Sequence, residues 1–173
     1  MRTPRRPTTR PVYEISIVRA HRGVALTAPQ IRRALRTVLA AEGVAGAEIA
    51  VSVLSDAAIR EVNRSHLNHD YATDAISFLY AAEHSELEAD APARSRNALR
   101  GRGLAIEGEV LVSGETALRE APRHGWDASS ELLLYIVHGL LHLCGYDDLS
   151  PGEKRIMRAR ERWALGLAGI ECK

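Results

Sequence analysis

Residues 138–148 read HGLLHLCGYDD, and the predicted fold is organised around this stretch. His138 and His142 are four positions apart, so in an α-helix their imidazoles project side by side from one face. Gly145 is a suitable helix stop, because glycine adopts the left-handed conformation beyond a helix C-terminus without steric penalty. The chain can then turn back and bring the carboxylate of Asp148 to the same place. Two nitrogens and one oxygen leave a position open for water, which is typical of a catalytic zinc site.

The residues before and within this motif predict that its helix is buried. The apolar positions are Leu132, Leu133, Leu134, Ile136, Val137, Leu140, Leu141 and Leu143. They cover nearly all sides of the helix, as in a core helix, and Asp127 or Ser129 is a suitable N-cap. Two histidines buried among leucines cost free energy unless they are hydrogen-bonded or bound to a metal. Hydrogen-bonded core histidines are the simpler alternative, but the spacing and the two carboxylates that follow favour a metal site.

The spacing also resembles the metalloprotease pattern HExxHxxGxxH, with Asp148 at the third ligand position. A protease of that type needs a glutamate next to the first histidine as its general base. This chain has Gly139 there. A metal site without that base favours a different hydrolysis, and a metalloprotease-like hydrolase stays the first alternative.

Three stretches together resemble the YbeY family of rRNA maturation factors. They are the histidine motif, residues 73–78 (TDAISF) and residues 108–113 (GEVLVS), with Asn63 in register ten positions before Thr73. Order and spacing agree from about residue 12 to the C-terminus. The resemblance implies a metal-dependent, single-strand-specific endoribonuclease acting in rRNA maturation and ribosome biogenesis. Its implied partners are single-stranded RNA, the rRNA precursor and the small ribosomal subunit, with no DNA expected.

The proposed metal ligands are His138, His142 and Asp148, which together hold one divalent ion per chain. We expect Zn²⁺, which would polarise a phosphate oxygen and lower the pKa of its bound water. His138 is therefore also assigned to catalysis, and Glu109 is the candidate proton acceptor. Whether a metal-activated water or a 2′-hydroxyl of the RNA attacks is left open by the sequence.

The resemblance adds three substrate-binding candidates, Asn63, Asp74 and Ser77. In the family, the strand that follows residue 73 borders the catalytic groove. The simpler interpretation of Asp74 and Ser77 is that polar groups at a turn and a strand end satisfy the backbone.

Two residues depart from the family pattern. The third metal ligand of the family is a histidine, whereas this chain has Asp148. A carboxylate oxygen also binds zinc, but it makes Mn²⁺ or another oxygen-preferring ion more competitive. The family also carries an arginine a few residues after the asparagine, thought to meet RNA phosphate, and Leu67 stands there. The second alternative follows from Leu67: a non-catalytic, ribosome-associated assembly factor with a structural metal.

Composition favours one soluble domain. The 173 residues are enough to bury a sizeable core, and the net charge of +1 does not itself indicate a nucleic-acid partner. Two cysteines favour a reducing cytoplasm, and no apolar run reaches membrane-spanning length. Residues 1–11 hold four arginines among prolines, which predicts a disordered basic tail or, alternatively, an RNA-contacting arm. Residues 12–173 are the expected YbeY-like domain.

Apolar periodicity predicts strands near residues 13–17, 49–53, 74–79 and 106–113. The strand–helix–strand order of the first half predicts a parallel crossover. We expect residues 81–103 to form a mobile loop joining two antiparallel strands. The expected fold is therefore α+β, a mixed four-stranded sheet packed by about five helices, with the histidines on a central buried helix.

The last predicted helix begins at the capping box of residues 150–153 (SPGE) and is amphipathic. Trp163 lies on its apolar side and is expected in the core. Its arginines mostly interleave with acids, which favours a solvated surface over a phosphate track. They are Arg155, Arg158, Arg160 and Arg162.

Overall fold

Four strands and five helices make up the part of the chain that the computed structural model describes, residues 10–84 and 99–170. In chain order they are β1 (Val12–Arg19), α1 (Ala28–Ala41), β2 (Gly46–Leu54), α2 (Asp56–Leu67), β3 (Ala75–His84), β4 (Leu104–Ser113), α3 (Gly114–His124), α4 (Ala128–Leu143) and α5 (Pro151–Leu167). The α+β class is confirmed. Nine of the eleven residues of the predicted tail, and residues 85–98 of the predicted loop, lie outside the described residues.

The sheet has the strand order β1-β2-β4-β3. β1 pairs with β2 and β2 with β4 in parallel, whereas β3 pairs with β4 antiparallel. The predicted parallel crossover and the predicted antiparallel pair are both confirmed. β3 is longer than predicted, because residues 81–84 resume pairing with β4 after a register shift between Leu79 and Ala81. The alanines of this segment carry no apolar periodicity, so the sequence did not reveal the extension.

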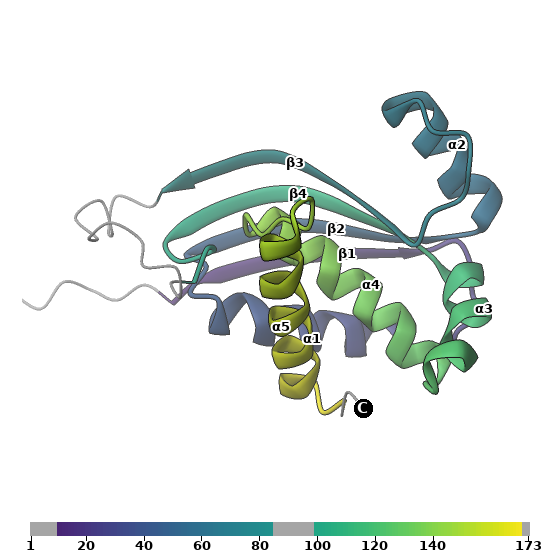
Figure 1. Ribbon diagram of the computed structural model, residues 1–173. Coiled ribbons are helices and arrows are strands. Elements are labelled where there is room, and N and C mark those ends of the chain that lie inside the picture. The colour runs from purple at the N-terminus through teal and green to yellow at the C-terminus, as the bar shows by residue number, and fades with distance from the viewer. Residues whose placement is uncertain (1–9, 85–98, 171–173) are drawn as a thin grey trace, which may run out of the picture.

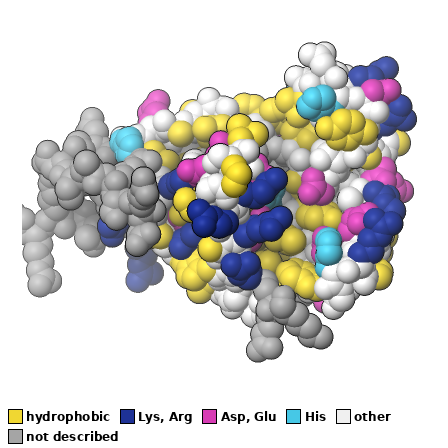
Figure 2. Space-filling view, viewed as in Figure 1, with side chains coloured by type: hydrophobic (Ala, Val, Ile, Leu, Met, Phe, Trp, Pro, Cys, Tyr) yellow, Lys and Arg dark blue, Asp and Glu magenta, His cyan; other side chains and the backbone are white. Residues whose placement is uncertain are grey.

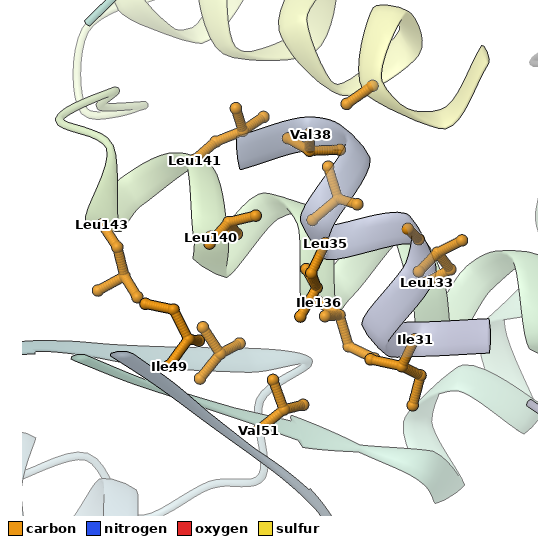
Figure 3. Packing of buried hydrophobic residues seen from close by; sticks show 14 of the residues in the cluster. Ile31, Leu35, Val38, Ile49, Val51, Leu133, Ile136, Leu140, Leu141 and Leu143 are labelled. Atoms are coloured by element: carbon orange, nitrogen blue, oxygen red, sulfur yellow. The ribbon is translucent and has the colours of Figure 1, made fainter. Parts of the chain in front are cut away.

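Helices α1 and α4 lie against one face of the sheet, and α5 packs on α4 (Figure 1). The side chains between them interlock, with Leu35 from α1, Ile49 from β2 and Leu140 from α4 pointing toward one another (Figure 3). All three are fully buried. On the opposite face, α2 covers only one end of the sheet, where Ile59 packs against Ile76 and Leu111.

Local sequence signals fix both ends of α4. The carboxylate of Asp127 accepts hydrogen bonds from the backbone N–H groups of Ser129 and Ser130, which caps the N-terminus. At the other end Gly145 has a φ of 93°, a conformation that side chains rarely adopt. The predicted N-cap and helix stop are thus both confirmed, and the turn after Gly145 sends the chain toward α5.

Arg160 of α5 does not lie on a solvated surface as predicted. Its guanidinium pairs with the fully buried carboxylate of Glu42 and stacks 3.7 Å from the ring centroid of Trp163. The phenol of Tyr146 donates a second hydrogen bond to Glu42 at 3.0 Å. A buried carboxylate must be paired, so Arg160 is held inward and its assignment to the solvated surface is wrong. None of the described helices has the length and apolar character needed to span a membrane.

Candidate metal centre

His138, His142 and Asp148 converge at the C-terminal end of α4. The Nε2 atoms of the two histidines are 3.0 Å apart, and Asp148 Oδ1 lies 3.7 Å from His142 Nε2. One ligand atom from each side chain falls within 4.8 Å of the others. The side chains are 24%, 26% and 35% exposed, respectively, so the group is partly open to solvent. The three residues that the sequence singled out are therefore brought together.

The second nitrogen of each imidazole is fixed by a protein oxygen. His138 Nδ1 lies 2.7 Å from Glu161 Oε1 on α5, and His142 Nδ1 lies 3.0 Å from the carbonyl oxygen of Tyr146. A carboxylate and a carbonyl accept hydrogen bonds, so each Nδ1 carries the proton and donates it. Partners of this kind orient histidine ligands and raise their basicity.

This hydrogen-bonding pattern fits a cation. With both protons on Nδ1, the neutral rings of His138 and His142 direct two Nε2 lone pairs at each other across 3.0 Å. Such an arrangement is repulsive unless a proton or a metal cation lies between them. Ligands of a tetrahedral zinc, with bonds of about 2.0–2.1 Å, are separated by about 3.3 Å, close to this distance. Two imidazole nitrogens and a carboxylate oxygen are donors that suit zinc and related divalent ions.

The electrostatics of the two histidines differ. Burial disfavours the charged form of His138, but the hydrogen bond and charge of Glu161, helped by Asp74 and Asp148, outweigh it and raise its pKa. For His142, burial and the neighbouring His138 together lower the pKa. His142 is therefore neutral at pH 7, as a metal ligand must be.

A pocket of about 170 Å³ opens beside the centre and is lined by Asp74, His138, Asp148 and Glu161. Asp74 Oδ1 accepts hydrogen bonds from Thr73 Oγ1 and from the backbone N–H of Ala75, so part of the carboxylate is used to shape the turn before β3. Its place in the pocket nevertheless puts it within reach of a substrate.

Ser77 lies on the sheet face that α4 covers. It pairs with Val110 across the antiparallel ladder, and directly paired residues share a face. Val110 faces α4, because a Cβ at Gly139 would lie 2.5 Å from Val110 Cγ1. The structure therefore places Ser77 on the same side of the sheet as the histidines.

Glu109 is not brought to the centre. Successive residues of a strand point to opposite faces, so Glu109 points away from α4 where Val110 points toward it. Its carboxylate accepts hydrogen bonds from Ser52 Oγ at 3.3 Å and Tyr80 Oη at 3.0 Å on the open face of the sheet. The sheet lies between Glu109 and His138, so this candidate proton acceptor cannot reach the metal ligands.

Asn63 is placed to hold a loop. It is only 2% exposed, and its Nδ2 donates to the carbonyl oxygen of Tyr71 at 2.9 Å. Its own backbone carbonyl accepts from the N–H of His69. Asn63 thus fixes the segment that leads from α2 to Asp74, while Leu67 at the end of α2 is 44% exposed.

Glu161 is the functional residue that sequence reasoning missed. A signal existed: Glu161 lies four positions after Met157 and three before Ala164, both of which are buried. A carboxylate beside the apolar stripe of an amphipathic helix requires a partner. The sequence alone did not show that the partner is His138.

Gly139 also bears on the metalloprotease alternative. A Cβ at this position would lie 2.5 Å from Val110 Cγ1, so the residue after the first histidine faces the sheet and has no room for a side chain. The glutamate that a protease of the HExxH type uses as a base has no place here.

The chain is thus an α+β protein with a candidate metal centre, formed by two histidines of its central helix and a carboxylate from the turn that follows. Within that class the chain belongs to the YbeY family, since the family model described as Endoribonuclease YbeY matches residues 20–168. The resemblance inferred from the sequence motifs is confirmed.

Individual relatives agree with this membership. A protein named Endoribonuclease YbeY from Rhodopirellula baltica is 38% identical over 144 residues, which cover 82% of this chain but only 64% of that protein. Another of the same name from Moorella thermoacetica is 37% identical over 141 residues, covering 81% of this chain and 85% of the relative. The solution structure of TM1509 from Thermotoga maritima matches with a TM-score of 0.57 and 20% identity, over 89% of this chain and 88% of that one. This last likeness supports the fold.

Proposed function

We propose that this chain is a metal-dependent endoribonuclease that cleaves single-stranded RNA during rRNA maturation in the cytoplasm. The observation that carries the proposal is the convergence of His138, His142 and Asp148, with both histidines held by outer partners so that their Nε2 lone pairs face a common point. The proposed substrate is an rRNA precursor in the context of the small ribosomal subunit. Membership of the family supports RNA as the substrate class.

The proposed ion is Zn²⁺, one per chain, held by His138, His142 and Asp148. When bound, it would act as a Lewis acid on a phosphate oxygen of the RNA. Asp148 is anionic where the family pattern has a histidine, which lowers the net positive charge of the centre and makes Mn²⁺ a stronger competitor.

Residues around the centre take distinct roles in this proposal. Glu161 positions the imidazole of His138. Asp74, in the turn before β3, and Ser77, on the α4 side of β3, contact the substrate. Asn63 acts indirectly, because a side chain 2% exposed holds the loop before Asp74 and does not itself meet RNA. Glu109 has no part in the reaction.

The test is RNA cleavage by the purified protein with and without a chelator, with the bound metal identified by elemental analysis. We expect cleavage of single-stranded RNA, loss of cleavage on chelation, and recovery on adding Zn²⁺ or Mn²⁺. A matched single-stranded DNA is the substrate control. His69→Ala is the matched protein control, because His69 is an exposed histidine that does not belong to the ligand group.

Other outcomes discriminate the alternatives. Co-sedimentation with small ribosomal subunits, without metal-dependent cleavage of RNA, would favour the non-catalytic assembly factor that Leu67 suggests. Chelator-sensitive cleavage of a peptide would revive the protease. Metal-independent cleavage that survives His138→Ala would contradict the proposal.

A further inference from the structure

Four basic side chains of α5 share one side of the helix. At 100° per residue, Lys154, Arg155, Arg158 and Arg162 fall within an arc of about 100°. All four are exposed, and none forms an ion pair with any residue in the described part of the chain. Figure 2 shows Lys and Arg side chains gathered over α5, on the face of the molecule that this view presents. The sequence favoured a merely solvated surface here, but the position of this arc suggests more.

One edge of this arc faces the metal centre. Glu161, which hydrogen-bonds to His138, lies three positions after Arg158 and seven after Lys154, so these three residues share a helix face. Lys154 and Arg158 both line the 170 Å³ pocket that also contains His138 and Asp148. Lys154 and Arg158 therefore face the pocket beside the metal centre, where the proposed function places the scissile phosphate.

Several other arginines of the described chain already pair with carboxylates. Arg160 of the same helix is turned inward onto buried Glu42. On α2, Arg60 pairs with Asp70 at 2.8 Å and Arg64 with Glu61 at 2.7 Å. Among the described residues that line the pocket, Lys154 and Arg158 of α5 supply the unpaired positive charge.

A phosphodiester can enter this pocket only if positive charge offsets the carboxylates that line it. Asp74, Asp148 and Glu161 line it, and these carboxylates repel a phosphodiester. Leu67 offers no cation at the position where the family pattern has its arginine. Lys and Arg side chains bind phosphate oxygens through charge-assisted hydrogen bonds and release counterions from the nucleic acid.

We propose that Lys154 and Arg158 bind the phosphates on either side of the scissile bond, and that Arg155 and Arg162 continue this phosphate track along α5. The occupant is the backbone of single-stranded RNA, so this inference rests on the proposed function and deepens it. The track reads charge and spacing, not base sequence, because its contacts are to phosphates.

The test compares the zinc-loaded wild type with the double variant Lys154→Gln/Arg158→Gln, using equilibrium binding of a short fluorescent oligouridylate over a range of salt concentrations. We expect the affinity for the oligouridylate to fall by about tenfold. The slope of log K against log salt should flatten by about 1.4, because each of the two lost phosphate contacts contributes about 0.7 on single strands. In cleavage, KM rises while kcat stays close to that of the wild type. Metal content and the melting temperature are unchanged.

The matched control is Arg33→Gln/Arg36→Gln, which removes two exposed charges from α1 outside this pocket. It should leave affinity and slope near the wild-type values, and Lys154→Arg/Arg158→Lys should bind like the wild type. Equal losses in both Gln double variants, or an unchanged slope in Lys154→Gln/Arg158→Gln, would overturn the track. If the wild type cleaves RNA but Lys154→Gln/Arg158→Gln binds it as tightly as the wild type does, the track is refuted and the nuclease is not. If the wild type does not cleave RNA but the double variant binds it more weakly, the track is supported and the nuclease is refuted.

Discussion

Gly139 of α4 and Val110 of β4 meet so closely that a Cβ at position 139 would lie 2.5 Å from Val110 Cγ1. This contact sets the distance between the helix and the sheet. Because His138 precedes Gly139, the same contact fixes the height of its imidazole above β3 and β4. A packing requirement in the core thereby determines the position of a candidate metal ligand.

Replacing Gly139 by alanine should destabilise the protein by about 1–3 kcal/mol, because an added methyl group has to displace Val110 or the helix. Urea denaturation measures the change. Gly166→Ala in α5 is the control, since nothing lies within 4 Å of a Cβ there. That substitution should be neutral or stabilising by about 0.5–1 kcal/mol. Equal destabilisation by both substitutions would contradict the close contact.

Asp148, not Asp147, is expected to be the third metal ligand. Asp147 Oδ1 accepts hydrogen bonds from the backbone N–H groups of Asp148 and Leu149, so its carboxylate shapes the turn. Asp148→Ala should lose the metal, whereas Asp147→Asn retains an acceptor oxygen and should keep it. Asp148→His should also keep the metal and move the pH optimum of RNA cleavage downward, because a neutral ligand leaves more positive charge at the centre. Elemental analysis of the three variants measures their metal content. Full metal content in Asp148→Ala would exclude Asp148 as the third ligand.

Glu161→Gln should weaken metal binding by about 10–100-fold, because an uncharged partner makes the His138 imidazole a poorer donor. Competition with a chromogenic chelator measures the affinity. The control is Glu153→Gln on the same helix, a carboxylate that pairs with Arg100 at 2.6 Å and with no metal ligand. If the two variants bind metal alike, Glu161 has no positioning role.

Asp56 at the start of α2 should make stability depend on pH. Partial burial alone would raise the pKa of its carboxyl, but hydrogen bonds from Ser113, Arg119 and Thr116 outweigh this and lower the pKa to about 2. The unfolded value is about 3.9. The stabilisation is therefore complete above about pH 4 and is lost as the pH falls through the folded value near 2.

Asp56→Asn should accordingly cost about 1–3 kcal/mol at neutral pH, and its difference from the wild type should shrink as the pH falls below 4. Denaturation curves at several pH values measure this. Asp70→Asn, which breaks the exposed pair with Arg60, should change stability by no more than about 1 kcal/mol. A constant difference between Asp56→Asn and the wild type from pH 7 to pH 2 would refute the linkage.

Features that depend on neighbours along the chain could be predicted from the sequence. The spacing of His138 and His142, the Asp127 cap and the Gly145 stop act within one helix and its ends, so local rules locate them. The strand–helix–strand order likewise predicted the parallel pairing of β1 and β2. The motif also places Asp148 six residues after His142, just beyond the helix stop at Gly145.

Which distant groups meet this helix depends on how the elements pack in three dimensions. Glu161 reaches His138 because α5 packs on α4, and Glu109 is excluded because the register of β4 turns Val110 toward Gly139. Arg160 is turned inward because the buried carboxylate of Glu42, far away in sequence, needs a countercharge. The periodicity of a sequence predicts which residues share one face of a helix or strand. It does not predict which other element packs against that face, because this depends on contacts between residues far apart in the sequence.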